Sequence, residues 1–315
     1  MKTRIFFSYV ELDQESADRL SQYAEVHSIQ SPNPEESKRN AEAILCLTLP
    51  PEEIKKLNRL KLIQALTAGV DGLPWKEIPP EVIVCGNMGS NADAVAEHTW
   101  AIILSIAKRI HHYFANVRQG DFRRNSELLQ LSGKTLAIIG MGAVGTRVAE
   151  IGKSFNMHVI GVTRSGKPKS PADQVFDPSK LRQVFSASDF IVISTPLTKH
   201  TREMIDLSLL RLLKKGSVVV NVGRAELVRR TDLLQFLTER PDVSFATDVW
   251  WEARRDGPWE TELVKLPNFF GTPWVAGAFG SREVYRKMLT AAVDNIIRYF
   301  KGETPLNIID RSEYV

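Results

Sequence analysis

The chain has 315 residues, with few cysteines, no long apolar run and little imbalance of charge. Its two cysteines, Cys46 and Cys85, lie in apolar strand-like segments, so we expect buried free thiols, with a disulfide between them as the alternative. No apolar stretch is long enough to cross a membrane, and the apolar run near the N-terminus is too short for a signal peptide. These absences predict a cytoplasmic protein with no membrane partner.

The sequence also lacks the basic cluster that is typical of nucleic-acid-binding proteins. Lysine and arginine total 41 against 37 acidic residues, and doublets such as Arg123-Arg124 are separated by acidic and apolar sequence. Because nucleic-acid binding needs clustered positive charge, we expect no nucleic-acid partner. The length predicts two domains, and an anionic cofactor with an anionic substrate would explain part of the positive excess.

The most informative stretch that the chain does contain is a glycine motif between two apolar runs. Residues 136–139 form a short apolar run, Gly140, Gly142 and Gly145 follow as G-x-G-x-x-G, and residues 158–162 form a second run after a helical pattern. The first glycine permits a sharp turn, the second lets a pyrophosphate approach the backbone, and the third lets helix and strand pack closely. This order predicts a dinucleotide-binding βαβ unit, with a purely structural turn as the alternative.

The end of the second strand indicates which nicotinamide cofactor binds. NAD sites usually carry an acidic residue there to hold the ribose 2′-hydroxyl, whereas this chain has Thr163, Arg164 and Ser165, followed by Lys167 and Lys169. Arginine can pair with a 2′-phosphate through its fork of donors, and Ser165 can add a hydrogen bond. We therefore favour NADP(H) over NAD(H), with a solvated basic loop as the alternative.

The rest of the chain alternates short apolar runs with amphipathic helical patterns. This alternation occurs both before and after the glycine motif, which predicts parallel sheets covered by helices. The predicted fold class is α/β, with two Rossmann-like or flavodoxin-like parallel-sheet domains and a cleft between them. In the first domain, strands are expected at residues 5–9, 43–47, 62–66 and 82–84.

A long amphipathic helix is predicted over residues 91–109. His98 lies one residue before its apolar face, where it is either directed toward the cleft or held as a structural histidine, the more common outcome. His111 and His112 are expected near the end of this helix, as surface residues favoured by the helix dipole.

Seven separated motifs belong to one pattern. They are TAGVDG at 67–72, NADAVAEH at 91–98, GMGAVG at 140–145, TPLTKHT at 195–201, NVGRAELV at 221–228, ATDVW at 246–250 and LPNFFGTPWVAG at 266–277. With these motifs, the chain resembles the D-isomer-specific 2-hydroxyacid dehydrogenases, a superfamily that includes glyoxylate/hydroxypyruvate reductases, phosphoglycerate dehydrogenase and formate dehydrogenase. The resemblance spans almost the whole chain.

The resemblance implies a division of the chain into three segments. Residues 1–91 are the first part of a substrate-binding domain, and residues 92–275 are an NADP-binding Rossmann domain. Residues 276–315 are a C-terminal helix and tail that return to the substrate-binding domain. The resemblance also implies an active site in the cleft and a homodimer joined through the cofactor domains.

The resemblance further implies roles for individual residues. Arg224 matches the arginine that binds the substrate carboxylate and polarises its carbonyl, for which a permanently charged fork of donors is suited. Ala68, Gly69 and Val70 match a carboxylate-binding loop, and Asn91 matches a polar residue at the cleft. Asp248 matches the aspartate that orients the nicotinamide carboxamide. The implied cofactor contacts are Gly140, Gly142, Ala143, Val144, Gly145, Arg164, Ser165, Thr195, Pro196, Thr201, Val222, Asp248 and Gly277.

Two positions depart from the family pattern. Where the family has its acid/base histidine in TPHxxG, this chain has Trp274, whose indole N–H does not titrate near neutral pH and cannot deliver a proton as imidazolium does. Trp274 either lines the substrate pocket or packs beneath it. The glutamate that pairs with the histidine is expected at Ala253, with Glu252 one residue short. Glu252 takes the catalytic role through a shifted loop, or the pair is absent.

Three functional hypotheses follow. The first is an NADPH-dependent oxidoreductase that interconverts a small anionic 2-oxo acid, such as glyoxylate or hydroxypyruvate, and its D-2-hydroxy acid, with a proton from water or from a group such as His98. The second is an enzyme of the same fold with another substrate, in which Trp274 stacks in the pocket. The third is a cofactor-binding sensor or scaffold without significant turnover. Because a scaffold would not need Arg224, Asp248 and the loop at 67–72, we prefer the first.

Overall fold

The structure is a computed structural model that describes residues 4–124, 128–251 and 262–315. The chain divides into two compact units. Unit 1 comprises Met1–Asn91 and Ser281–Val315, and unit 2 comprises Ala92–Gly280. The roles of the predicted segments in binding substrate and cofactor stay predictions.

Unit 1 is built on a five-stranded parallel sheet in the order β2-β1-β3-β4-β5. All residues of β3 and β4 are buried, because a parallel sheet is covered on both of its faces. The strands are β1 (Ile5–Ser8), β2 (Glu25–Ser28), β3 (Ala43–Cys46), β4 (Leu62–Ala65) and β5 (Ile83–Cys85).

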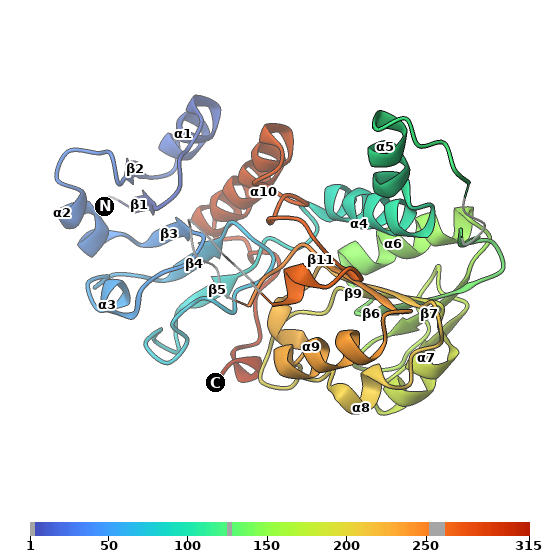
Figure 1. Ribbon diagram of the computed structural model, residues 1–315. Helices are drawn as coiled ribbons and strands as arrows, with labels where there is room; N and C mark the ends of the chain where they lie inside the picture. Colours follow the sequence, from blue (N-terminus) through green and yellow to red (C-terminus); the bar gives the residue numbers. More distant parts are fainter. Residues whose placement is uncertain (1–3, 125–127, 252–261) are drawn as a thin grey trace. The chain divides into compact units, whose positions relative to one another are not determined.

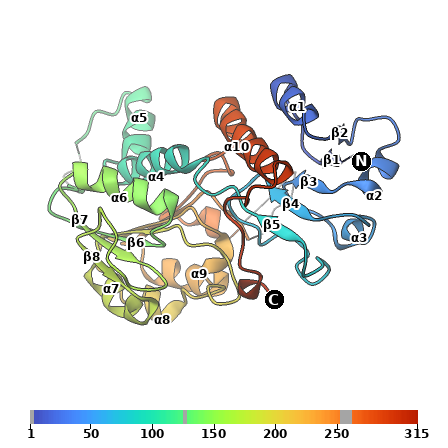
Figure 2. The ribbon, with the colours of Figure 1, turned by 180° about the vertical axis from the view of Figure 1, so that it is seen from behind.

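The last helix of the chain belongs to unit 1, since α10 packs against α1 and β4 (Figure 2). Asn295 of this helix donates to Gln64 Oε1 at 2.7 Å and accepts from the Leu306 N–H at 2.6 Å, which ties the C-terminal tail to the sheet. The helices of unit 1 are α1 (Gln14–Ser21), α2 (Pro34–Asn40), α3 (Pro51–Ile54) and α10 (Arg282–Phe300).

Unit 2 contains a seven-stranded parallel sheet in the order β12-β11-β10-β9-β6-β7-β8. From β6 the chain adds β7 and β8 on one side and then returns to add β9 to β12 on the other. The sheet is therefore doubly wound, and its topological switch point lies between β6 and β9. The strands are β6 (Thr135–Ile139), β7 (His158–Val162), β8 (Gln174–Phe176), β9 (Phe190–Ile193), β10 (Val218–Asn221), β11 (Ser244–Thr247) and β12 (Phe269–Gly271).

Helices cover both faces of this sheet (Figure 1). α4 and α6 pack on one face, and α7, α8 and α9 lie on the other. The helices of unit 2 are α4 (Ala92–Ala107), α5 (Ile110–Arg118), α6 (Ala143–Ser154), α7 (Leu181–Ala187), α8 (Leu207–Leu210) and α9 (Arg230–Glu239).

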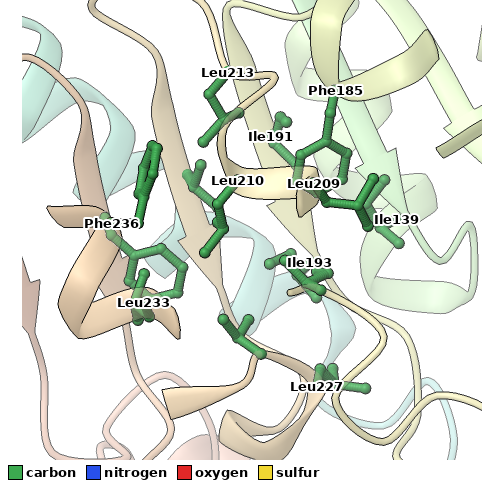
Figure 3. Close-up of a cluster of buried hydrophobic side chains, with 14 of the residues drawn as sticks. Ile139, Phe185, Ile191, Ile193, Leu209, Leu210, Leu213, Leu227, Leu233 and Phe236 are labelled. Atoms are coloured by element: carbon green, nitrogen blue, oxygen red, sulfur yellow. The ribbon is translucent and has the colours of Figure 1, made fainter. Parts of the chain in front are cut away.

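Each face of the sheet carries its own apolar core. Ile139 of β6 belongs to the core beneath α7 and α8, where Figure 3 shows it with Phe185 and Leu209. The preceding residue, Ile138, belongs to the opposite core with Trp100 of α4. Successive side chains of a strand point to opposite faces, so a strand buried on both sides reads as an unbroken apolar run.

The predicted α/β fold class with two parallel sheets is confirmed, although two strands were not predicted. β2 and β8 both lie at the edge of their sheet and carry partly exposed residues. Neither contains the continuous apolar run by which the buried strands are predicted. Cys46 and Cys85 are buried free thiols, as predicted, and burial raises the pKa of the Cys46 thiol to about 12.

His111 is exposed, as predicted, but the predicted position of His111 and His112 near the end of a helix is wrong. α4 ends at Ala107, Arg109 adopts a left-handed conformation with a φ of 50°, and His111 and His112 lie in the first turn of α5. The helix predicted over 91–109 is present as α4, but the left-handed residue separates it from α5, so these histidines are at a helix start and the dipole argument does not apply to them.

Within the described ranges, none of the helices has the length and apolar character that a bilayer crossing requires.

Candidate functional site

The predicted site residues of unit 2 follow the carboxyl ends of its parallel strands. Gly140 follows β6, Arg164 lies just beyond β7, Thr195 just beyond β9, Val222 follows β10, and Asp248 follows β11. Neighbouring parallel strands end at the same edge of a sheet, and ligands of open α/β sheets bind at that edge. The fold therefore brings to one edge residues that are far apart in the sequence.

The glycine turn lies at the switch point, where backbone segments approach closely. Gly140 has a φ of 104°, and a Cβ there would lie 2.6 Å from the Thr195 nitrogen. A Cβ on Gly145 would lie 2.1 Å from the Gly140 carbonyl oxygen, which also accepts the Ser194 hydroxyl at 2.9 Å. Only glycine fits at these two positions. The turn, the start of α6 and the end of β9 are thus packed as one piece.

The start of α6 fits a pyrophosphate. Gly142 is the N-cap residue, no side chain caps the helix, and its first turn, which includes Ala143 and Val144, has no acidic residue. The space beside Gly142 is open, since no atom lies within 4 Å of an added Cβ. The first N–H groups of a helix lack partners within it and carry the positive end of its dipole, so they can bind a phosphate group.

The segment after β7 lies beside the glycine turn. The Gly140 N–H donates to the Val162 carbonyl at 3.0 Å, which joins the ends of β6 and β7. Arg164 and Ser165 follow and are exposed. Lys169 reaches back from the same segment and donates to the Met141 carbonyl within the glycine turn. The predicted pyrophosphate site and the predicted 2′-phosphate site are therefore adjacent in unit 2.

The ends of β9 and β10 carry further predicted residues. The Thr201 hydroxyl donates to the Pro196 carbonyl at 2.7 Å, so the loop after Thr195 folds back on itself. The Val222 N–H donates to the Ile193 carbonyl at 3.0 Å, which continues the pairing of the two strands into their loops. Thr195 and Val222 thus end neighbouring strands beside the glycine turn.

Arg224 projects from a backbone turn that a buried amide holds. The side chain of Asn221, which is fully buried, donates to the Arg224 carbonyl at 2.8 Å and accepts from the Gly223 N–H at 3.1 Å. Nη1 of Arg224 donates to the Gly223 carbonyl at 3.0 Å, and the side chain is half-buried. The amide fixes the backbone from which the guanidinium projects.

The carboxylate of Asp248 organises the loop after β12. The Asp248 residue is 4% exposed. Its Oδ1 accepts from the Thr272 hydroxyl at 2.6 Å and from the Val275 N–H at 3.0 Å, and its Oδ2 accepts from the Ala276 N–H at 2.9 Å. Three donors compensate the carboxylate for the water it loses on burial. Residues 272–276 are therefore held by one side chain, that of the residue directly after β11.

Trp274 lies in this loop with a φ of 55°, a left-handed conformation that is uncommon for a residue other than glycine. Its N–H donates to the Thr272 carbonyl at 3.1 Å, and its half-buried side chain packs against the core of Figure 3. Gly277 follows, and its carbonyl accepts the Gly280 N–H at 3.2 Å.

Sequence reasoning missed Thr272. His98 of α4 contacts the Thr272 hydroxyl through Nε2 at 2.9 Å, and this nitrogen lies 3.8 Å from Asp248 Oδ1. Of the three, only Asp248 was assigned a site role by a motif. The T-P pair before Trp274 marks the position of Thr272 but does not indicate that a helix 174 residues earlier contacts it.

The remaining predicted residues belong to unit 1 or lie outside the described residues. Ala68, Gly69 and Val70 form the loop after β4, where the Thr67 hydroxyl donates to the Gly69 carbonyl at 2.9 Å and the Trp75 indole to the Val70 carbonyl at 2.9 Å. Asn91 is the half-buried residue at which the first segment of unit 1 ends. Glu252 lies outside the described residues.

The doubly wound sheet and its glycine turn define the class as an α/β protein with a dinucleotide-binding sheet. Residues 100–276 match the family model for the D-isomer specific 2-hydroxyacid dehydrogenase, NAD binding domain. The chain is 31% identical over 329 residues to a glyoxylate reductase from Aeropyrum pernix, with 99% of this chain and 97% of that protein covered. The chain therefore belongs to the D-isomer specific 2-hydroxyacid dehydrogenase family of NAD(P)-dependent oxidoreductases that act on CH–OH groups.

Two further relatives agree with this assignment. A glyoxylate reductase from Thermococcus litoralis is 29% identical over 289 residues, which cover 88% of this chain and 86% of that protein. The crystal structure of a candidate formate dehydrogenase from Pyrobaculum aerophilum is 38% identical, with a TM-score of 0.87 over 99% of this chain and 100% of that one. The two-sheet fold is thus that of the family.

Two glycines of the turn are predicted to differ in role, one in packing of the protein and the other in binding of the cofactor. Gly145→Ala should lower the free energy of unfolding by about 2 kcal/mol, because the new methyl group meets the Gly140 carbonyl oxygen. Gly142→Ala has open space and should change stability by less than about 0.5 kcal/mol, yet weaken NAD(P)H binding by filling the phosphate site. Thermal unfolding and calorimetric titration with each cofactor measure the two effects. A large loss of stability in Gly142→Ala would contradict this assignment.

Proposed function

We propose that this protein is an NADPH-dependent reductase that interconverts a small 2-oxo acid and its D-2-hydroxy acid. The observation that carries the proposal is the joint presence, at one edge of the unit 2 sheet, of the glycine turn, Arg224 and Asp248. The similarity to glyoxylate reductases from Aeropyrum pernix and Thermococcus litoralis supports glyoxylate or a close analogue as the substrate.

The proposed cofactor site uses the backbone at the start of α6 and the basic segment after β7. When bound, the nicotinamide supplies the hydride in reduction and accepts it in oxidation. The N–H groups of the first α6 turn bind the pyrophosphate, and Arg164 with Ser165 binds the 2′-phosphate. The absence of a carboxylate at residues 163–169 supports NADP(H) over NAD(H). Thr195, Pro196, Thr201, Val222, Asp248 and Gly277 are proposed as further contacts.

Each proposed substrate contact binds either the carboxylate or the carbonyl of the 2-oxo acid. Arg224 binds the carboxylate and polarises the carbonyl of the 2-oxo acid, since a guanidinium stays charged and binds two oxygens at once. In unit 1, the backbone of Ala68, Gly69 and Val70 binds the carboxylate, with Asn91 as a polar contact. The carbonyls of Gly69 and Val70 accept hydrogen bonds from the Thr67 hydroxyl and the Trp75 indole, which hold the loop in place. A loop held in this way can present its backbone N–H groups to an anion.

Trp274 sets the proposed enzyme apart from a reductase with a histidine at this position. Reduction consumes one proton, which an indole cannot supply, so the proton comes from water or from another side chain. Because general acid catalysis contributes about 10²–10⁴-fold, its loss slows turnover without abolishing it. Glu252 stays a candidate for a catalytic role through a shifted loop.

The missing acid also favours a second candidate function. A protein that binds NADPH and a 2-oxo acid but turns over slowly would act as a sensor or a scaffold of the same fold. This alternative rests on Trp274 alone. The Asn221-held turn of Arg224 weighs against it, because a scaffold has no need of a positioned guanidinium.

The first experiment follows NADPH oxidation by the purified protein with glyoxylate, hydroxypyruvate and larger 2-oxo acids, beside the Trp274→His variant. We expect slow turnover by the wild type and a gain on the order of 10²-fold in kcat for the variant, because imidazolium donates the missing proton. Tight NADPH binding without turnover in the wild type, and turnover gained by the variant, would support the sensor. Failure of both proteins to bind any 2-oxo acid would overturn the proposed substrate class.

Cofactor preference is tested by Arg164→Asp. The substitution removes a charge-assisted pair and adds a repelling carboxylate, so NADPH affinity should fall by on the order of 30-fold, equivalent to about 2 kcal/mol. NADH affinity should change by less than about threefold. Fluorescence titration of both cofactors gives the comparison, and equal losses for the two would remove the argument for NADP(H).

We also propose that two copies of unit 2 pair through α5 and the residues that follow it. Phe114, Val117 and Phe122 are 64%, 47% and 74% exposed, so three large apolar side chains of one short segment are open to a partner. Phe114→Glu and Phe122→Glu should convert a dimer into the single 35.4 kDa chain in sedimentation velocity. Ile29→Glu, an equally exposed apolar position of unit 1, is the matched control and should leave the dimer intact.

A further inference from the structure

The contacts of Thr272 determine the direction of each hydrogen bond in the cluster around it. A threonine hydroxyl has one hydrogen, which it donates to Asp248 Oδ1 at 2.6 Å. His98 Nε2 lies 2.9 Å from the Thr272 hydroxyl oxygen. Because the only hydrogen of that hydroxyl is already donated to Asp248, His98 Nε2 is the donor of this second hydrogen bond and carries a proton. The cluster is therefore a directed chain from His98 through Thr272 to Asp248.

Thr272 also holds the backbone of the loop. Its carbonyl accepts the Trp274 N–H at 3.1 Å and the Trp250 indole N–H at 3.0 Å. Thr272 is thus bonded to His98 of α4 and to Asp248 through its side chain, and to the Trp274 backbone through its main chain. A change at Thr272 is transmitted directly to the backbone of Trp274.

The conformation of Trp274 requires such support. A non-glycine residue in the left-handed region costs about 1–3 kcal/mol and persists only where its surroundings hold it. Trp274 has a φ of 55°, and the next two residues, Val275 and Ala276, both donate to Asp248. The hydrogen bonds to Asp248 therefore oppose the relaxation of Trp274 toward an ordinary conformation.

We propose that His98 is a positioning residue that acts through Thr272 and Asp248 to hold Trp274 in its left-handed conformation, and so sets the fit of the 2-oxo acid. The effect on the acid rests on the proposed function, and on the interpretation that Trp274 lines the substrate pocket. The effect on the loop does not. His98 in this role does not touch substrate or donate a proton to it.

Hydrogen exchange of the complete protein without cofactor tests the effect on the loop. Thr272→Val removes the hydroxyl and keeps the shape, and His98→Phe removes the donor. Each should speed exchange of the Val275 and Ala276 amides at least about tenfold, which corresponds to about 1.4 kcal/mol of lost protection. The matched variants Thr272→Ser and His98→Gln keep a donor at the same place and should restore slow exchange. Equal exchange in all four variants and the wild type would overturn the proposal.

Binding and kinetics test the effect on the acid. In Thr272→Val and His98→Phe, the KM for the best 2-oxo acid, and the Kd of oxamate as a non-reacting analogue, should rise about tenfold, with rescue in the Ser and Gln variants. The same substitutions in a Trp274→Gly background should raise the KM and the Kd by less than about twofold, because glycine adopts a positive φ without strain.

Faster exchange with undiminished acid binding would confine the role of His98 to the loop and refute its effect on the acid. Absence of acid binding in the wild type would refute the proposed function, while the exchange data would still decide the role of His98.

Discussion

The close passage of two backbone segments at the switch point of the unit 2 sheet constrains the rest of the molecule. The end of β6 turns beside Thr195, and the first turn of α6 passes so close to it that a Cβ on Gly145 would lie 2.1 Å from the Gly140 carbonyl oxygen. This contact determines where α6 begins and therefore where its N–H groups point. It also aligns the ends of β6 and β9, from which the row of site residues extends. Packing rather than ligand binding thus accounts for two of the three glycines, and only Gly142 borders open space.

Much of the fold could be predicted because a parallel sheet covered on both faces leaves a clear pattern in the sequence. β3, β4, β9 and β10 are buried at all four positions, and apart from Gln64 of β4 and Asn221 of β10 they consist of apolar residues. β2 and β8 could not be predicted, since an edge strand needs no apolar run and takes its place from backbone pairing. The second helix that begins after Arg109 was not predicted, because the apolar spacing continues past this residue and no local pattern marks its φ of 50°.

The candidate site was predictable where a residue lies directly after a strand and carries a motif. Gly140, Val222 and Asp248 are of this kind, because strand order alone brings strand ends to one edge. The contact of His98 with Thr272 was not predictable. It depends on the angle at which α4 crosses the sheet, which no local pattern encodes, and it joins residues 174 positions apart.

The hydrogen bonds of the loop after β12 account for the backbone conformation of Trp274. The left-handed conformation of Trp274 costs about 1–3 kcal/mol. This strain is offset by hydrogen bonds from Thr272, Val275 and Ala276 to Asp248, none of which involves the indole. The backbone at this position is therefore set by its neighbours and not by the side chain it carries. A histidine at position 274 should therefore adopt the same backbone conformation. The Trp274→His variant would add a titratable side chain without changing the backbone that carries it.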